Sequence, residues 1–180
     1  LLGKNLLVCS PTASGKTLIA ELAAVTTILR KGTKTVYVVP LKALASEKHK
    51  LFTRRYPFLK IGIATGDLDS REPYLKDKDI IICTSEKLDS LIRHKISWLN
   101  QISVLIFDEI HLLNDYSRGP TLEILITILK EALEKPQIIG LSATIGNPEE
   151  LAEWLKAELV VDSWRPVRLH KGVCLNADVE

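Results

Sequence analysis

The sequence has 180 residues, which is enough for one domain with a well-buried core. Its 46% hydrophobic and 26% charged residues, with no apolar run near the roughly 18 residues of a membrane span, exclude a disordered, fibrous or membrane-embedded chain. The formal net charge of +2 permits contact with nucleic acid but does not argue for it, since a mixed, solvated surface explains the value equally well.

The first predicted strand leads into a loop of small residues. The sequence Ser-Pro-Thr-Ala-Ser-Gly-Lys-Thr fills positions 10–17, and an amphipathic helix is predicted over 18–29. Such a loop cradles nucleotide phosphates, because backbone N–H groups face them, Gly15 permits close approach and Lys16 reaches the β- and γ-phosphates. Thr17 would place its hydroxyl on Mg²⁺. The predicted phosphate-binding residues are Thr12, Ala13, Ser14, Gly15, Lys16 and Thr17.

Apolar runs rich in β-branched residues alternate with helical patterns along the rest of the chain. Strands are predicted at 35–39, 60–64, 80–83, 103–107, 137–141 and 159–161, and apolar helical stripes at 88–92, 122–133 and 151–155. Asn147 before Pro148 predicts an N-cap and the first turn of the last helix. This alternation predicts an α/β fold, a doubly wound, mostly parallel sheet with helices on both faces. Ligands bind such sheets at the carboxyl ends of the strands.

Two carboxylates end the predicted strand at 103–107. Asp108 can hold Mg²⁺ through water, and Glu109 can orient or deprotonate the water that attacks the γ-phosphate. Although Asp-Glu pairs are common at strand ends, a phosphate loop at the neighbouring strand end makes this pair the hydrolytic half of an ATPase. His111 alone would be a structural histidine.

A Ser-Ala-Thr sequence follows the predicted strand at 137–141. The hydroxyls of Ser142 and Thr144 could form hydrogen bonds with His111 or the carboxylates and so couple the sites. An ordinary helix cap or turn is the alternative interpretation.

These three motifs, in this order, resemble motifs I, II and III of superfamily-two DExH helicases. The sequences at 39–48, 65–67, 84–87, 118–123 and 141–154 narrow the resemblance to the archaeal Holliday-junction-migration (Hjm) helicases, relatives of the helicase part of DNA polymerase theta. The resemblance implies the first RecA-like, P-loop domain of an ATP-dependent 3′-to-5′ DNA helicase that acts on forked or stalled replication structures. It also implies ATP and Mg²⁺ as cofactors, and Lys16, Asp108 and Glu109 as catalytic residues.

The resemblance further implies two nucleic-acid loops that line the translocated strand. Motif Ia would comprise Pro40, Leu41 and Lys42, and motif Ib would contain Thr84, Ser85 and Lys87. From the residues alone, Lys42 and Lys87 suit phosphate contacts that carry no sequence information, but a solvated surface charge is the simpler interpretation of each.

We expect residues 1–166 to form the motor domain and 167–180 an exit strand and linker toward a second RecA-like domain. The sequence contains no Met, which favours a piece of a longer protein, and only Leu1 to Lys4 precede the first strand, where the family recognises adenine upstream. Arginine fingers would belong to later domains.

The remaining expectations concern compartment and rival functions. We expect a cytoplasmic protein with no membrane partner, because a secretory signal is absent. Cys9, Cys83 and Cys174 are interpreted as buried, reduced thiols and not as a metal site or disulfide framework, since their number is odd and two of them lie in apolar, strand-like runs. Single-stranded and forked DNA are the expected nucleic acids. An RNA-directed DExH motor and a nucleic-acid-binding module with a decayed ATPase are the alternatives.

Overall fold

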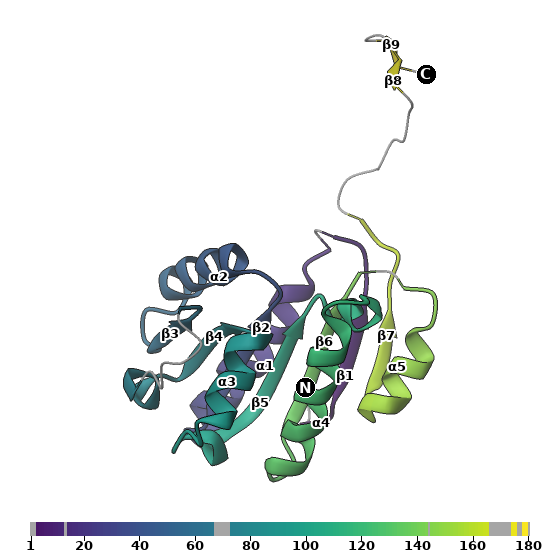
Figure 1. Ribbon diagram of the computed structural model, residues 1–180. Helices are drawn as coiled ribbons and strands as arrows, with labels where there is room; N and C mark the ends of the chain where they lie inside the picture. Colours follow the sequence, from purple (N-terminus) through teal and green to yellow (C-terminus); the bar gives the residue numbers. More distant parts are fainter. Residues whose placement is uncertain are drawn as a thin grey trace.

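The computed structural model describes residues 3–12, 14–66, 73–143, 145–165, 174–175 and 178–179. Seven strands form one sheet in the order β3-β4-β2-β5-β6-β1-β7, and every neighbouring pair is parallel (Figure 1). The strands are β1 (Leu6–Cys9), β2 (Lys34–Val39), β3 (Ile61–Ala64), β4 (Ile80–Thr84), β5 (Ile102–Asp108), β6 (Gln137–Ser142) and β7 (Glu158–Val161). The predicted parallel α/β sheet is confirmed.

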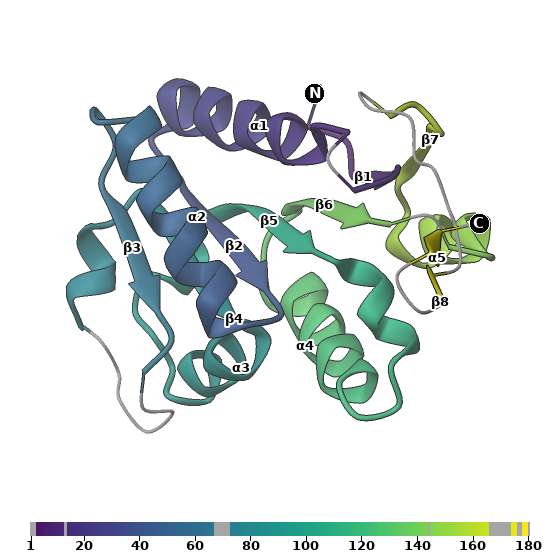
Figure 2. The same cartoon turned by 90° about the horizontal axis from the view of Figure 1, so that it is seen from above.

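Helices cover both faces of this sheet, because the central strands are apolar on both sides. The helices are α1 (Lys16–Lys31), α2 (Lys42–Arg55), α3 (Ser85–Arg93), α4 (Gly119–Ala132) and α5 (Pro148–Leu155). Figure 2 shows α1 on one side of the sheet and α3 and α4 on the other. The side chains of α1 and α2 pack into one hydrophobic cluster, whereas those of α3, α4 and α5 pack into a second one. Successive residues of one strand join different clusters, as Tyr37 and Val38 do on β2.

Polar contacts also hold α1 against α2. Glu21 on α1 is almost fully buried, and its carboxylate accepts two hydrogen bonds from Arg55 Nη1, at 2.9 and 2.6 Å. The Tyr56 hydroxyl donates a third hydrogen bond at 2.6 Å. A buried carboxylate needs such partners, so this cluster fixes the two helices that flank the phosphate loop and motif Ia.

The start of α5 differs in detail from its prediction. Pro148 occupies the first helical turn as predicted. Asn147 stands at the N-cap position, but its side chain caps no backbone N–H and instead donates to Glu150 Oε2 at 3.0 Å. Asn147 therefore contacts the first turn through its amide N–H group, whereas its side-chain oxygen, the atom that would cap the helix, accepts no backbone N–H.

The predicted domain boundary between 166 and 167 lies outside the described residues, as does most of the predicted exit strand. Cys174–Leu175 and Asp178–Val179 pair as a short antiparallel hairpin, β8 and β9. Within the described part of the chain, no helix is both long enough and apolar enough to cross a membrane.

Candidate nucleotide-binding site

The predicted phosphate loop and the predicted carboxylates lie at the same edge of the sheet, where β1, β5 and β6 end. The loop follows β1, and Asp108 is the last residue of β5. The prediction that these strands are neighbours is wrong, because β6 pairs with both of them and lies between. The position of β6 places Ser142 between the loop and the acids, at the end of the strand that pairs with β5.

The phosphate loop has the backbone that its glycine permits. Gly15 adopts φ 90° and ψ 13°, a left-handed conformation that disfavours other residues, and no atom of the described residues lies within 4 Å of the position that a Cβ would take. The 16-residue helix α1 begins at Lys16, so its positive N-terminal end faces the open side of the loop. This open, electropositive cradle suits nucleotide phosphates.

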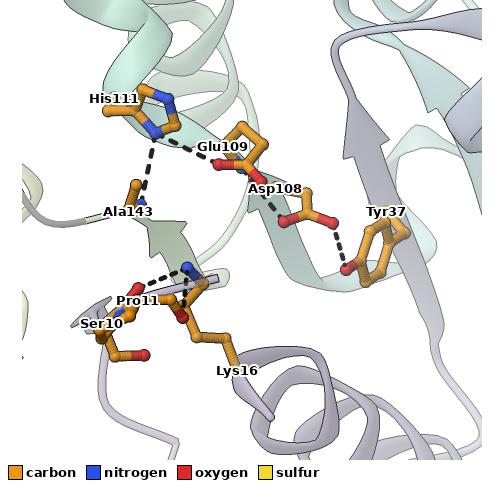
Figure 3. A network of polar contacts seen from close by, with 8 residues as sticks. All are labelled: Ser10, Pro11, Lys16, Tyr37, Asp108, Glu109, His111 and Ala143. Carbon is orange, nitrogen blue, oxygen red and sulfur yellow. Dashed lines mark hydrogen bonds and ion pairs between the residues drawn. The ribbon is translucent and has the colours of Figure 1, made fainter. Parts of the chain in front are cut away.

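The side chains of the loop contact one another (Figure 3). Lys16 Nζ donates to the carbonyl oxygens of Ser10 at 2.6 Å and Pro11 at 3.5 Å, so the ammonium lies over the loop. The Ser10 and Ser14 hydroxyls share a hydrogen bond of 2.6 Å. Thr12 is exposed, and Ala13 lies outside the described residues. Of the predicted phosphate-binding residues, the structure thus brings Ser14 through Thr17 together at the start of α1.

Asp108 is held by two groups that sequence reasoning missed. The Tyr37 hydroxyl, from β2, donates to Asp108 Oδ2 at 2.9 Å (Figure 3), and Lys48 Nζ, from α2, lies 3.3 Å from the same oxygen. Burial, reinforced by the charge of Asp108, raises the pKa of Tyr37 far above its usual range, so the phenol keeps its proton and donates. Only 11% of the Asp108 side chain is exposed. Its carboxylate is therefore fixed in orientation.

Lys48 also donates to Thr17 Oγ1 at 2.9 Å, so one ammonium bridges the two predicted metal ligands. This geometry shows that both oxygens converge on a single cation position. Oxygen ligands of this kind suit Mg²⁺, so Thr17 and Asp108 fit the predicted metal. A weak signal for Lys48 existed in the sequence, since it lies three residues after Ala45 and four before Phe52, the two buried positions of α2.

Glu109 has a strained backbone. Its φ of 55° and ψ of 43° place a non-glycine residue in the left-handed region, between β5 and the 3₁₀ segment Ile110–Asn114. Its side chain is 36% exposed and points toward the site edge, where its Oε2 lies 3.3 Å from His111 Nδ1 (Figure 3). A strained backbone of this kind persists only where the surrounding structure imposes it. Here the left-handed conformation turns the Glu109 carboxylate away from the buried strand β5.

The predicted link between motif II and Ser142-Ala143-Thr144 exists, but through different atoms. The backbone N–H of Ala143, not a hydroxyl, donates to His111 Nδ1 at 3.4 Å. The Ser142 hydroxyl is buried and has no hydrogen-bond partner among the described residues. Thr144 lies outside them. The predicted hydrogen bond from Ser142 to His111 is therefore wrong, while the contact between the two motifs is present.

The two predicted nucleic-acid loops also meet at this edge, but only some of their side chains reach the surface. Leu41 and Lys42 are exposed, and Pro40 and Ser85 line a cavity of about 20 Å³ beside Asp108 and Glu109. In motif Ib, two side chains lie inside the domain.

Thr84 is buried at the start of α3, where its Oγ1 accepts from the backbone N–H of Lys87 at 3.3 Å. The Lys87 side chain is fully buried. Its interpretation as a solvated surface charge is wrong, and neither side chain is placed to contact a nucleic-acid strand in this conformation. Pairing and packing within the domain outweigh the usual exposure of a lysine.

The thiols at this sheet are structural. Cys9 and Cys83 are buried and form no disulfide, and burial raises the pKa of the Cys9 thiol. The prediction of buried, reduced thiols is confirmed for these two.

A parallel sheet carries a phosphate loop with its lysine after β1 and an Asp-Glu pair at the end of β5, with one strand, β6, between them. This arrangement defines a P-loop nucleotide-binding domain. The family model for DEAD/DEAH box helicases matches residues 1–151, and the chain belongs to this family. The predicted resemblance to DExH helicases is confirmed.

The similar proteins include archaeal DNA helicases. The chain is 57% identical over 174 residues to "ATP-dependent DNA helicase Hel308" of Pyrococcus horikoshii, covering 96% of this chain and 24% of that protein. It is 55% identical over 184 residues to the Methanocaldococcus jannaschii protein of the same name, with 98% and 15% covered. The chain thus spans about a quarter or less of the length of these relatives.

A solved helicase structure has a fold similar to that of this chain. The DUF1998 helicase MrfA, described as bound to DNA, superposes with a TM-score of 0.75 at 25% identity, covering 90% of this chain and 26% of that one.

Proposed function

We propose that the chain is the first motor domain of an ATP-dependent 3′-to-5′ DNA helicase that acts on forked or stalled replication structures. The observation that carries the proposal is the convergence of Lys16, Thr17, Asp108 and Glu109 at one edge of the sheet. The names of the archaeal relatives support DNA as the nucleic acid.

In this proposal, the loop and Lys16 bind the β- and γ-phosphates of ATP, and Glu109 orients or deprotonates the attacking water. Thr17 and Asp108 would hold Mg²⁺, which neutralises charge on the phosphates when it is bound. Tyr37 keeps the Asp108 carboxylate in one orientation. The hydrogen bond between His111 and Ala143 connects motif II to the end of β6. Such a connection suits the coupling of ATP hydrolysis to movement along the nucleic acid.

The proposal is tested by strand separation with the full-length protein. Forked duplexes with a 3′ tail, a 5′ tail or an RNA tail are compared with and without ATP, with Lys16→Ala as the inactive control. We expect unwinding of the 3′-tailed DNA fork, lost in Lys16→Ala. Preference for the RNA-tailed substrate would favour an RNA-directed motor, and binding of all substrates without ATP-dependent unwinding would favour a nucleic-acid-binding module.

A further inference from the structure

We propose that Lys48 is a positioning residue that competes with Mg²⁺ for Thr17 and Asp108, and that it leaves this position when the metal enters. The inference rests on the proposed function of the nucleotide site. Lys48 Nζ lies 2.9 Å from Thr17 Oγ1 and 3.3 Å from Asp108 Oδ2, the two groups assigned to the metal. Among the described cationic side chains, Lys48 is the one found in contact with both groups.

The Lys48 ammonium is largely buried, and side chains of the domain surround it. The Lys48 side chain is only 14% exposed, and Nζ lies 5.6 Å from the centre of the Tyr37 ring, over its face. The Tyr37 hydroxyl donates to the same Asp108 oxygen that Lys48 contacts. A cation with three partners from α1, β2 and β5 differs from an exposed surface ion pair, which contributes little.

Competition follows from the geometry of the two cations. Mg²⁺ binds oxygen at about 2.0–2.1 Å, tolerates little deviation from octahedral geometry and keeps several waters, so Thr17 would bind it directly and Asp108 through one of these waters. An ammonium within hydrogen-bond distance of both Thr17 and Asp108 occupies the space between them, and two cations repel each other at such a distance. Lysine has a flexible four-carbon stem, so Lys48 can withdraw without movement of α2.

The same contact prepares the site for the metal. Because the ammonium only donates, Thr17 Oγ1 must accept, and one of its lone pairs points toward the cation position. Asp108 Oδ2 is likewise directed there. Lys48 therefore maintains the arrangement of the ligands and, at the same time, raises the Mg²⁺ concentration needed to fill the site.

The test measures metal binding itself, with Mn²⁺ alone as the probe and electron paramagnetic resonance of the free ion as the readout. In the full-length protein, Lys48→Met removes the charge and retains an unbranched stem. Lys50→Met, on an exposed position of the same helix, is the matched control. We expect Lys48→Met to bind Mn²⁺ about tenfold more tightly than the wild type, or about 1.4 kcal/mol. Lys48→Arg, which retains the charge, and Lys50→Met should match the wild type.

Equal Mn²⁺ affinity of Lys48→Met and the wild type would overturn the competition, and so would weaker binding, because Lys48 would then only organise the site. If circular dichroism shows that Lys48→Met is unfolded, Lys48→Gln takes its place. Asp108→Asn distinguishes a failure of the proposed metal site from a failure of the proposed competition by Lys48. Wild-type affinity in Asp108→Asn would place the metal elsewhere and overturn the proposed site, whereas weakened binding there with no effect at Lys48 overturns the inference alone.

Discussion

Lys16 and Glu109 reach the nucleotide site from different elements and are predicted to do different work. Lys16 opens α1 and lies over the phosphate loop, whereas Glu109 follows β5 and faces the site edge. In the full-length protein, Lys16→Ala should weaken ATP binding about tenfold or more, since it removes charge-assisted hydrogen bonds to phosphate. Titration with a fluorescent ATP analogue measures this loss.

Glu109→Gln should retain ATP binding and lose hydrolysis. The amide keeps the size of the side chain but cannot accept a proton from water, so turnover should fall about 10²-fold or more. Steady-state phosphate release, measured beside the binding titration, checks this split. Near-normal turnover of Glu109→Gln would show that another group activates the water.

Tyr37 should stabilise the fold through its hydroxyl. Tyr37→Phe removes the hydrogen bond to Asp108 Oδ2, in a place closed to solvent, and leaves Lys48 as a partner. The free energy of unfolding should fall by about 1–3 kcal/mol, the range for hydrogen bonds to charged groups. Urea denaturation of the 180-residue chain measures it, with the fully exposed Tyr116→Phe as the control. If Tyr37→Phe lowered the free energy of unfolding no more than Tyr116→Phe does, the Tyr37 hydroxyl would not stabilise the fold.

At the scale of elements, the start of α4 depends on close backbone packing. A Cβ on Gly119 would lie 2.2 Å from the carbonyl oxygen of Leu113, so the helix start or the preceding 3₁₀ segment must move in Gly119→Ala. We expect a destabilisation of about 1–3 kcal/mol in urea denaturation, as for other overpacked sites. Gly146→Ala is the matched control, because within the described part of the chain no atom lies within 4 Å of its Cβ position. Equal stability of the two variants would contradict the packing argument.

Most strands and helices could be predicted to within a few residues, because local patterns determine them. Helix α2, Lys42–Arg55, was not predicted, since only Ala45 and Phe52 are buried on it and its apolar stripe is weak. The run predicted as a strand over 103–107 forms β5, Ile102–Asp108, and the helix predicted over 18–29 lies within α1. Strand order could not be predicted in the same way, so the position of β6 between β1 and β5 was missed. Order depends on which apolar faces pack together over long separations, and no local pattern records that.

The same limit explains the missed parts of the site. Tyr37 and Asp108 are 71 residues apart, and Thr17 and Lys48 are 31 apart, so only the folded sheet brings them together. For Lys87 the sequence pattern was misleading. Its charge predicted exposure to solvent, but the side chain lies on the inner face of α3 and is buried. The phosphate loop and the carboxylates were predictable because their chemistry depends on contiguous residues.

At the scale of the whole molecule, the described site comes from one edge of one sheet, and the chain spans about a quarter or less of its archaeal relatives. The resemblance to DExH helicases implies that the transition-state arginines belong to a later domain. Such arginines contribute about 10³ to 10⁵ in the rate of phosphoryl transfer, more than the parts described here can replace. We therefore expect this domain to hold half of an ATP site.

The most direct test of that claim is the rate of ATP hydrolysis by the purified 180-residue chain, measured beside the full-length protein with and without single-stranded DNA. The account predicts turnover by the chain at least about 10³-fold below that of the DNA-stimulated full-length protein, with little response to DNA. DNA-stimulated turnover by the chain at a rate near that of the full-length protein would contradict the half-site assignment and show that the domain contains a complete motor.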